Sequence, residues 1–437
     1  MQRSLYSELL VWKNDSVRKP LVLRGTRQTG KTFLLQLFGI NEFRKSHYLN
    51  FQLDKKARSI FEENLSPESI IAKLEFHLAT RFEQDTDLLI LDEIQDCPRA
   101  LTSLKFFYEQ MPKLAVCCAG SLLGVVHSKE PFPVGKVTFL NLWPLSFGEF
   151  LLERDPRAYN AWSTITKDIS IPEIIHNVLM ERLREYYVVG GMPEAVKTYC
   201  AHLDNPLSAF EQVRSLQQDL LTSFISDFSK YSHSVHAQEI VSIFESIPSH
   251  LAKENKKFKP SVVAAKSRFS SFKNAIDWLT GAGLANKVMI TNSGEIPFSA
   301  FTEENRFKLY LFDTGLLGAL AHIPIQSFIT PSDLFATFKG AFCENFVSQE
   351  FTCATSMPLY CYANNTSEIE FLREIDGQVY PIEVKAGQSG KLKSLNVFAS
   401  KYRTPCRVRF SARNLEINEQ AQMHSYPLYL AGRFPLV

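Results

Sequence analysis

Short runs of apolar residues, separated by stretches with helical spacing, dominate the first 150 residues of this chain. A continuous apolar run of about four to eight residues is typical of a strand that is buried on both faces, as in a parallel sheet. Strands that alternate with helices predict a doubly wound α/β domain, in which ligands bind at the carboxyl ends of the strands. The runs that predict strands are residues 20–24, 48–51, 88–91, 114–121 and 137–140.

The pattern becomes helical after Phe150. Apolar residues recur at helical spacing over residues 174–183, and amphipathic helices are predicted between residues 206 and 250. The segment Gly190–Pro193 interrupts this pattern with a turn. We expect residues 151–232 to form a helical lid and connector.

The alternation that is typical of strands returns near the end of the chain. Residues 368–372 and 379–386 alternate between apolar and polar positions, whereas residues 339–347 have the pattern of a helix. We therefore expect a second α/β domain at residues 331–437, after a separate region at residues 233–330.

The composition is that of an ordinary soluble globular protein, with 45% hydrophobic and 22% charged residues. A chain of 437 residues is too long for one core and predicts roughly two to four domains. Its formal net charge of +2 does not favour binding of a polyanion by the chain as a whole. The eight cysteines form no CxxC pair, which argues against a zinc site or a disulfide framework.

The beginning of the chain lacks the apolar run of a secretion signal, and no uncharged apolar stretch is long enough to span a bilayer. We therefore expect a cytoplasmic protein that does not enter a membrane.

A glycine-rich loop directly follows the first predicted strand and precedes a predicted helix at residues 33–38. A phosphate-binding loop requires this context, because its glycines let backbone N–H groups face phosphate oxygens and the helix N-terminus favours an anion. Lys31 is expected to reach the β- and γ-phosphates, and the Thr32 hydroxyl to bind Mg²⁺. The loop that predicts binding of a nucleoside triphosphate consists of Gly25, Thr26, Arg27, Gln28, Thr29, Gly30, Lys31 and Thr32.

Two carboxylates directly follow the apolar run at residues 88–91. Asp92 is expected to hold Mg²⁺ through the water shell of the metal, and Glu93 to polarise the attacking water as a general base. An acidic turn after a core strand is the alternative interpretation. In combination with the phosphate-binding loop, the pair predicts hydrolysis of the nucleotide.

Ser121 is the small polar residue at the end of the run at residues 114–121, and it is expected to sense the γ-phosphate from beside the acidic strand. The alternative interpretation is that its hydroxyl caps the next helix.

Several of these segments together resemble the AAA+-type ATPases of bacteria and archaea that carry an uncharacterised C-terminal region. The resemblance covers nearly the whole chain and implies an AAA+-like fold of the P-loop NTPase class at residues 1–150, with ATP as the nucleotide; it does not imply a biological role. The segments that carry it are the GTRQTGKT loop, the LDEIQ strand, the AGSLLG segment, Val134–Val137, Leu142–Phe150, Gly190–Val196 and Lys308–Leu317.

Residues 253–273 are strongly basic and lie in a region, 233–330, whose order of helix, helix, glycine stop and strand resembles a winged helix. In that geometry the second helix would enter a DNA groove and the basic groups would contact phosphates. A winged helix used for protein contacts and a solvated basic face are the alternatives. The segment contains Lys253, Lys256, Lys257, Lys259, Lys266, Arg268 and Lys273 against the single acid Glu254.

An acid on a helix, an acid on a strand and an ExK sequence on the next strand resemble the restriction-endonuclease-like fold, with Glu344, Glu370, Glu383 and Lys385 as a second site. In such folds the carboxylates bind Mg²⁺ and the lysine positions water or stabilises charge on phosphate. The strand acid is usually Asp, so the longer Glu370 would displace the metal. Gln388 and Lys391 are further candidates for this site, and a fold used only for docking is the alternative.

Three hypotheses for the whole chain follow. The first is an ATP-driven, Mg²⁺-dependent AAA+-type ATPase with a DNA-associated or regulatory role. The second is a metal-dependent nuclease regulated by ATP, and the third is a non-hydrolysing switch whose ATP binding controls a protein partner. An oligomer would add an arginine finger in trans, for which Arg27, Arg99 and Lys136 are candidates.

Overall fold

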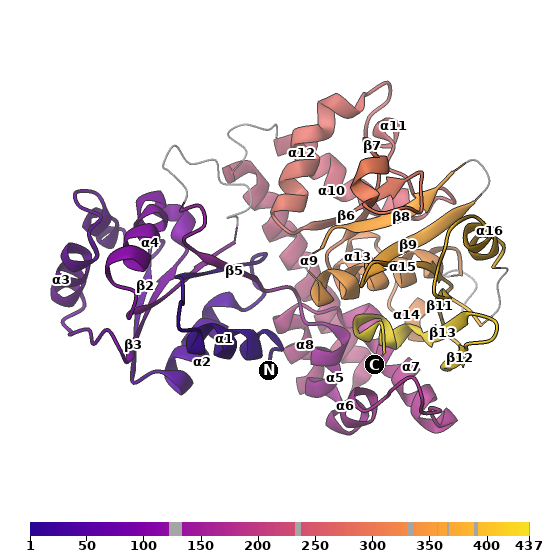
Figure 1. Ribbon diagram of the computed structural model, residues 1–437, viewed down its shortest axis with the longest axis horizontal. Helices are drawn as coiled ribbons and strands as arrows, with labels where there is room; N and C mark the ends of the chain where they lie inside the picture. Colours follow the sequence, from indigo (N-terminus) through magenta and orange to yellow (C-terminus); the bar gives the residue numbers. More distant parts are fainter. Residues whose placement is uncertain are drawn as a thin grey trace. The chain divides into compact units, whose positions relative to one another are not determined.

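The computed structural model describes residues 1–121, 133–231, 237–329, 336–355, 357–364, 367–388 and 392–436. The chain divides into two compact units, an N-terminal unit at Met1–Trp143 and a C-terminal unit at Pro144–Val437, and each unit has its own sheet (Figure 1). No helix in these described ranges is both long and apolar enough to cross a membrane.

The N-terminal unit contains a five-stranded sheet in which every neighbouring pair is parallel. The order is β2-β3-β4-β1-β5, so β4 lies between the strand that leads into the glycine-rich loop and the strand that ends in Asp92. The strands are β1 (Leu21–Arg24), β2 (Lys45–Asn50), β3 (Asp87–Asp92), β4 (Ala115–Gly120) and β5 (Thr138–Asn141). The predicted parallel α/β fold is confirmed.

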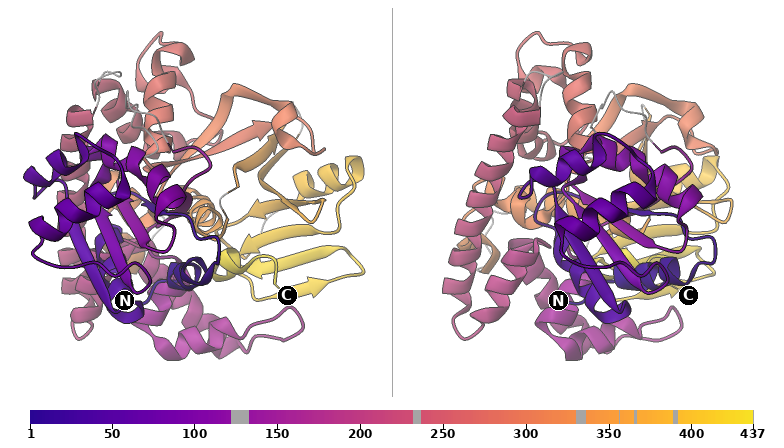
Figure 2. Two further views of the ribbon diagram at one scale, coloured as in Figure 1. Left: turned by 60° about the vertical axis from the view of Figure 1, so that its left-hand side comes forward. Right: turned by 90° about the vertical axis from the view of Figure 1, so that its left-hand side faces the viewer.

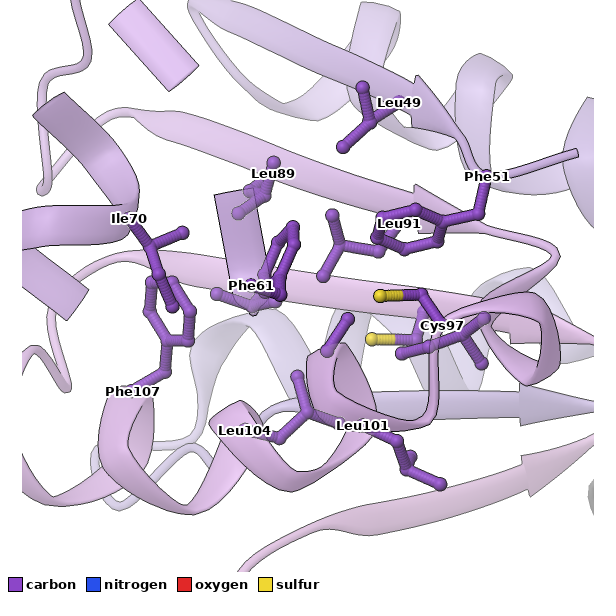
Figure 3. Close-up of a cluster of buried hydrophobic side chains, with 14 of the residues drawn as sticks. Leu49, Phe51, Phe61, Ile70, Leu89, Leu91, Cys97, Leu101, Leu104 and Phe107 are labelled. Carbon is purple, nitrogen blue, oxygen red and sulfur yellow. The ribbon is translucent and has the colours of Figure 1, made fainter. Parts of the chain in front are cut away.

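Both faces of this sheet are covered, which explains why its central strands are continuously apolar. Leu88 and Ile90 of β3 belong to the core under α1 (Leu5–Asn14) and α2 (Lys31–Glu42). Leu89 and Leu91, which alternate with them, belong to the opposite core under α3 (Pro67–His77) and α4 (Pro98–Gln110). Figure 3 shows this second core, in which the leucines of β3 face the side chains of α4. Two short 3₁₀ helices, η1 (Lys56–Phe61) and η2 (Ile94–Asp96), complete this side.

The C-terminal unit begins with helices, as the sequence predicted after Phe150. The first of them starts at a capping box, in which the Ser146 hydroxyl accepts from the Glu149 N–H and the Glu149 carboxylate accepts from the Ser146 N–H. The helices are α5 (Phe147–Arg154), α6 (Pro156–Ser163), α7 (Glu173–Val189), α8 (Pro193–Ala201), α9 (Pro206–Tyr231), α10 (Ala237–Leu251), α11 (Pro260–Val263), α12 (Phe269–Gly281), α13 (Thr314–Leu320), α14 (Gln326–Ile329), α15 (Ala336–Ala354) and α16 (Lys393–Lys401).

A mixed eight-stranded sheet forms the other part of the C-terminal unit, with the order β12-β13-β11-β10-β9-β8-β6-β7 (Figure 2). The strands are β6 (Ala285–Thr291), β7 (Thr302–Leu311), β8 (Leu359–Ala363), β9 (Glu368–Ile375), β10 (Gln378–Val384), β11 (Arg407–Ser411), β12 (Glu416–Asn418) and β13 (Met423–Pro427). Two further 3₁₀ segments belong to this unit: η3 (Phe298–Phe301) lies between β6 and β7, and η5 (Leu428–Arg433) follows β13.

The region expected to resemble a winged helix contains helices α10, α11 and α12 followed by the antiparallel pair β6–β7. This pair does not stand apart as a wing, because β6 also pairs in parallel with β8 over Val288–Thr291 and so extends the C-terminal sheet. The division of the chain into four domains remains a prediction.

Two segments that carried the family resemblance meet at a buried carboxylate in the C-terminal unit. Asp313 Oδ2 accepts a hydrogen bond of 2.6 Å from the Gly191 N–H, and Oδ1 accepts one of 2.9 Å from the Leu316 N–H at the start of α13. Gly190 has a φ of +71°, and a Cβ there would lie 2.2 Å from Asp313 Oδ1. The Gly190–Gly191 and Asp313–Thr314–Gly315 sequences therefore hold α7 and α13 together, which is a structural role.

Candidate functional site

The glycine-rich loop joins β1 to α2 at the carboxyl edge of the parallel sheet. Gly25 has a φ of +155°, and a Cβ there would lie 2.2 Å from the carbonyl oxygen of Leu142, so only glycine fits. Gly30 is in the left-handed region and precedes α2, and among the described residues no side chain caps this helix end. The first N–H groups of α2 are therefore available to an anion, as a phosphate site requires.

Lys31 is buried inside the loop that it is predicted to serve. Its ammonium donates hydrogen bonds to the carbonyl oxygens of Gly25, at 3.0 Å, and Thr26, at 2.7 Å. Burial lowers the pKa of Lys31 to about 8, although the nearby carboxylates of Glu93 and Asp92 act in the opposite direction. The cation is thus held next to the loop backbone and in the field of the acidic strand.

The two predicted magnesium ligands are in direct contact. The Thr32 hydroxyl donates a hydrogen bond of 2.8 Å to Asp92 Oδ2, and the Glu93 N–H donates one of 3.0 Å to Asp92 Oδ1. Asp92 is only 2% exposed, so its carboxylate depends on these donors for stabilisation. An alcohol and a carboxylate at this spacing fit the oxygen ligands that Mg²⁺ prefers.

Glu93 follows Asp92 in the left-handed region, with φ 50° and ψ 46°. Such backbone conformations are uncommon for residues other than glycine and cluster at functional sites. The Gln95 amide donates a hydrogen bond to Glu93 Oε2 and thereby restrains the predicted general base.

Ser121 lies immediately after β4, between the ends of the loop strand and the acidic strand. It is 4% exposed, and within the described part of the chain its hydroxyl has no hydrogen-bond partner. A buried hydroxyl without a partner suits a group that binds a ligand oxygen. The alternative, a cap on the following helix, concerns residues 122–132, which lie outside the described residues.

Sequence reasoning missed the neighbour of Asp92 on β2. The Tyr48 hydroxyl donates a hydrogen bond of 2.8 Å to Asp92 Oδ2, and the Asn50 amide lies 3.4 Å from the same oxygen. Burial, together with Asp92, raises the pKa of Tyr48 to about 12, so the phenol stays protonated. A tyrosine and an asparagine two positions apart near the end of a strand were visible in the sequence, but the sheet order that brings β2 beside β3 was not.

A second residue that the sequence reasoning missed ties the start of the chain to the loop. The buried Arg3 guanidinium donates to the carbonyl oxygens of Thr29, at 2.9 Å, and Trp143, at 2.5 Å. These contacts connect the loop backbone at Thr29 to the residue that ends the N-terminal unit, Trp143.

In the C-terminal unit, Glu344 lies on α15 and is engaged by a residue of the basic segment. The Lys256 ammonium forms an ion pair with Glu344 Oε1, and the Tyr310 hydroxyl donates a hydrogen bond of 2.9 Å to Oε2. Both oxygens of this predicted metal ligand therefore have partners in the chain.

The other three residues of the predicted second site come together, and Glu344 lies near enough for its charge to act on Glu370 and Lys385. Lys385 pairs with Glu383 and lies 3.8 Å from Glu370. Burial, followed by the charges of Glu383 and Glu344, raises the pKa of Glu370 well above its ordinary value. Glu383 Oε2 is buried, and no partner for it exists among the described residues.

Wherever side chains are described, no group of three or more His, Cys, Asp or Glu residues is placed to hold a metal ion. Gln388 is exposed, and Lys391 lies outside the described residues. Whether this cluster acts on nucleic acid remains a prediction.

The basic segment divides into internal and exposed cations. Lys256 is turned inward to Glu344, whereas Lys273 forms an ion pair of 2.6 Å with Glu304 in which both side chains are largely exposed. The exposed cations of the segment are Lys253, Lys259, Lys266 and Arg268.

The sequence family described as an AAA domain matches residues 17–151, which contain the loop, Asp92, Glu93 and Ser121. The N-terminal unit is an AAA domain of the AAA+ type. Two families described as domains of unknown function, DUF8612 and DUF4143, match residues 180–327 and 339–429. The resemblance to AAA+-type ATPases with an uncharacterised C-terminal region is confirmed. Among curated proteins, none matches this chain.

Solved structures of other P-loop proteins are similar to this chain at low sequence identity. A Walker-type ATPase of Pyrococcus abyssi has a TM-score of 0.45 at 14% identity, over 73% of this chain and 95% of that one. The Aeropyrum pernix ORC1 protein in complex with DNA has a TM-score of 0.32 at 14% identity, over 75% of this chain and 92% of that one. The Holliday junction branch migration motor RuvB of Thermotoga maritima has a TM-score of 0.32 at 13% identity, over 70% of this chain and 92% of that one.

Two of the candidate arginine-finger residues of the AAA domain have partners within the domain. Arg99 Nε donates to the Phe61 carbonyl oxygen at 2.9 Å, and Lys136 forms an ion pair of 3.1 Å with Glu109. Arg27 lies in the phosphate-binding loop itself. These contacts do not select one of the three as the finger.

Proposed function

We propose that the AAA domain binds ATP together with Mg²⁺ and hydrolyses it. The observation that carries this proposal is the hydrogen bond between Thr32 and Asp92 at the mouth of a loop that leads into an uncapped helix. A phosphate cradle alone would support binding, whereas the adjacent pair of magnesium ligands and Glu93 supports chemistry.

Each residue has a defined task in this proposal. The loop backbone and the Lys31 ammonium hold the phosphates, and Thr32 and Asp92 hold the cation, directly and through its water shell. Mg²⁺, when bound, neutralises charge that develops on the phosphates. Glu93 accepts a proton from the attacking water, and the Ser121 hydroxyl donates to the γ-phosphate.

The proposal is tested by steady-state ATP hydrolysis with Mg²⁺ and with EDTA, using wild type, Lys31→Met and Glu93→Gln. We expect hydrolysis that requires Mg²⁺, and a loss of about 10²–10⁴-fold in Glu93→Gln, which removes the general base but keeps the shape of the side chain. Glu93→Gln should still bind ATP. Tight binding without turnover in the wild type would instead identify a non-hydrolysing switch.

A DNA-associated role is the second candidate, and the exposed cations of the basic segment support it. Lys253 and Lys259 flank the turn after α10, and Lys266 and Arg268 precede α12. Cations gathered on one short segment neutralise phosphates without requiring a basic chain overall.

DNA binding is tested with a fluorescent duplex at several salt concentrations, and ATP hydrolysis with and without that duplex. Lys259→Glu/Lys266→Glu should weaken binding and flatten its salt dependence. The matched control Lys55→Glu/Lys105→Glu reverses two exposed lysines of the AAA domain and should retain binding. Equal DNA binding by both variants would exclude the basic segment as the DNA-binding site. ATP hydrolysis that DNA does not change would favour a protein partner instead.

A further inference from the structure

The hydrogen bond from Tyr48 to Asp92 follows from the register of two parallel strands. Asn50 of β2 lies directly opposite Asp92 of β3, and Tyr48 is opposite Ile90. Residues two positions apart point to the same face of a strand, so Tyr48 and Asn50 both face the carboxylate. The phenol oxygen lies 2.8 Å from Asp92 Oδ2.

The direction of this hydrogen bond is set by Asn50. The Asn50 side-chain oxygen accepts from the N–H groups of Gln52, at 2.9 Å, and Leu53, at 3.0 Å, which fixes which end of the amide carries the NH₂ group. That NH₂ group donates to the Tyr48 hydroxyl at 3.1 Å. Because the phenol oxygen already accepts from Asn50, its own proton is directed to Asp92.

The donors around Asp92 leave limited room for further hydrogen bonds. Oδ2 accepts from Thr32 and Tyr48 at 2.8 Å and from the Asn50 amide at 3.4 Å, while Oδ1 accepts from the Glu93 N–H at 3.0 Å. An ionised carboxylate has about four acceptor positions, so Oδ1 retains one for a water molecule of a cation shell. Tyr48 and Thr32, with Asn50 as the longest of the three contacts, occupy Oδ2 and leave Oδ1 available.

We propose that Tyr48 is a positioning residue for magnesium, which holds the Asp92 carboxylate in the orientation that receives the water shell of the cation. The proposal rests on the proposed ATP and Mg²⁺ binding of the AAA domain. It assigns to Tyr48 the role of an outer-shell partner, whose loss in metal sites typically costs about 10–100-fold in metal affinity or activity.

The test measures the affinity of a fluorescent ATP analogue for the full chain, once with Mg²⁺ and once with EDTA. In Tyr48→Phe the gain in affinity that Mg²⁺ provides should fall by about tenfold, while the affinity in EDTA stays the same. Asn50→Ala removes the group that orients the phenol and also a direct, longer contact with Asp92 Oδ2, and this variant should lose part of the gain. Thermal unfolding of each variant establishes that it is folded.

Tyr6→Phe is the matched control. It also removes a tyrosine hydroxyl of the same unit, which donates a hydrogen bond of 3.0 Å to Glu42 and lies on α1, outside the site. This variant should keep both affinities of the wild type.

The outcomes separate this proposal from the one on which it rests. A wild type without Mg²⁺-dependent binding would overturn the proposed function and the role of Tyr48 with it. A Tyr48→Phe variant with the full Mg²⁺ gain would overturn the positioning role alone. An equal loss with Mg²⁺ and with EDTA would also overturn it, since that result reflects support of the loop rather than of the cation.

Discussion

The Thr32 hydroxyl donates a hydrogen bond of 2.8 Å to Asp92 Oδ2 although 60 positions separate the two residues in the sequence. The contact joins the first turn of α2 to the end of β3, and these elements meet because both lie at the carboxyl edge of one parallel sheet. It places an alcohol and a carboxylate at the end of the phosphate-binding loop.

Thr32→Val should therefore reduce Mg²⁺-dependent nucleotide binding by at least about tenfold, because it removes the hydroxyl and keeps the branched shape. Thr32→Ser retains the hydroxyl and should behave like the wild type. The measurement is nucleotide affinity at increasing Mg²⁺ concentration. Equal affinities in the valine and serine variants would contradict the assignment of Thr32 as a magnesium ligand.

Lys31→Met should weaken ATP binding without lowering the thermal stability of the protein. The variant should lose roughly 10–100-fold in ATP affinity, the equivalent of about one hydrogen bond to a charged group. Without nucleotide it should unfold at the same temperature as wild type or higher, since burial already lowers the pKa of Lys31 to about 8 and a buried cation is costly. Thermal unfolding and nucleotide titration on one preparation check both statements. A variant that binds ATP normally would show that Lys31 does not contact the phosphates.

The ion pair between Lys256 and Glu344 should matter more for stability than an exposed pair on the same segment. The side chains are 16% and 6% exposed, so Lys256→Met leaves the buried Glu344 carboxylate without its ion-pair partner and should cost up to about 3–5 kcal/mol. Lys256→Met/Glu344→Gln removes both charges and should recover much of this loss. Urea unfolding of the full chain measures the difference.

Lys273→Met is the control for that experiment, because it breaks an ion pair at the surface. The side chains of Lys273 and Glu304 are 44% and 58% exposed. It should unfold at nearly the same urea concentration as the wild type. If Lys256→Met did so too, the buried ion pair would contribute nothing to stability.

Glu350 should make the stability of the C-terminal unit depend on pH. It is buried on α15, and Oε1 accepts a hydrogen bond of 2.8 Å from the Phe147 N–H at the start of α5. Burial raises the pKa of Glu350 from 4.5 to about 8, against the effect of that hydrogen bond. Between these two values the folded protein retains a proton that the unfolded chain has released, so stability falls as pH rises and levels off above about 8.

Glu350→Gln removes this titration and keeps an oxygen that accepts from Phe147. The unfolding temperature of the variant, relative to that of the wild type, should therefore be higher at pH 9 than at pH 5 by roughly 2–4 °C or more. Glu194→Gln replaces an exposed carboxylate on α8 and should show a difference from wild type that is the same at both ends of this range. A constant difference for Glu350→Gln would contradict the assigned titration.

Much of the AAA domain could be predicted because its signals are local. The glycines of the loop, the apolar runs of the buried strands and the carboxylates after residue 91 each depend on neighbours in the sequence. The roles of Tyr48 and Lys256 could not be predicted in this way. Each acts on a carboxylate far along the chain, and its partner is fixed by strand order and by how a loop packs on a helix.

The sequence by itself thus determined the phosphate-binding loop and the parallel α/β fold around it. The backbone conformation of the loop and the pattern of buried positions in the strands depend on residues that are consecutive in the sequence. Only the tertiary structure decided which side chains meet. It placed β4 between β1 and β3, brought Tyr48 and Thr32 to the same oxygen of Asp92, and paired Glu344 with a lysine of the basic segment. The reason is physical: hydrogen bonds and ion pairs act over a few ångströms, and chain topology decides which distant residues come within that range.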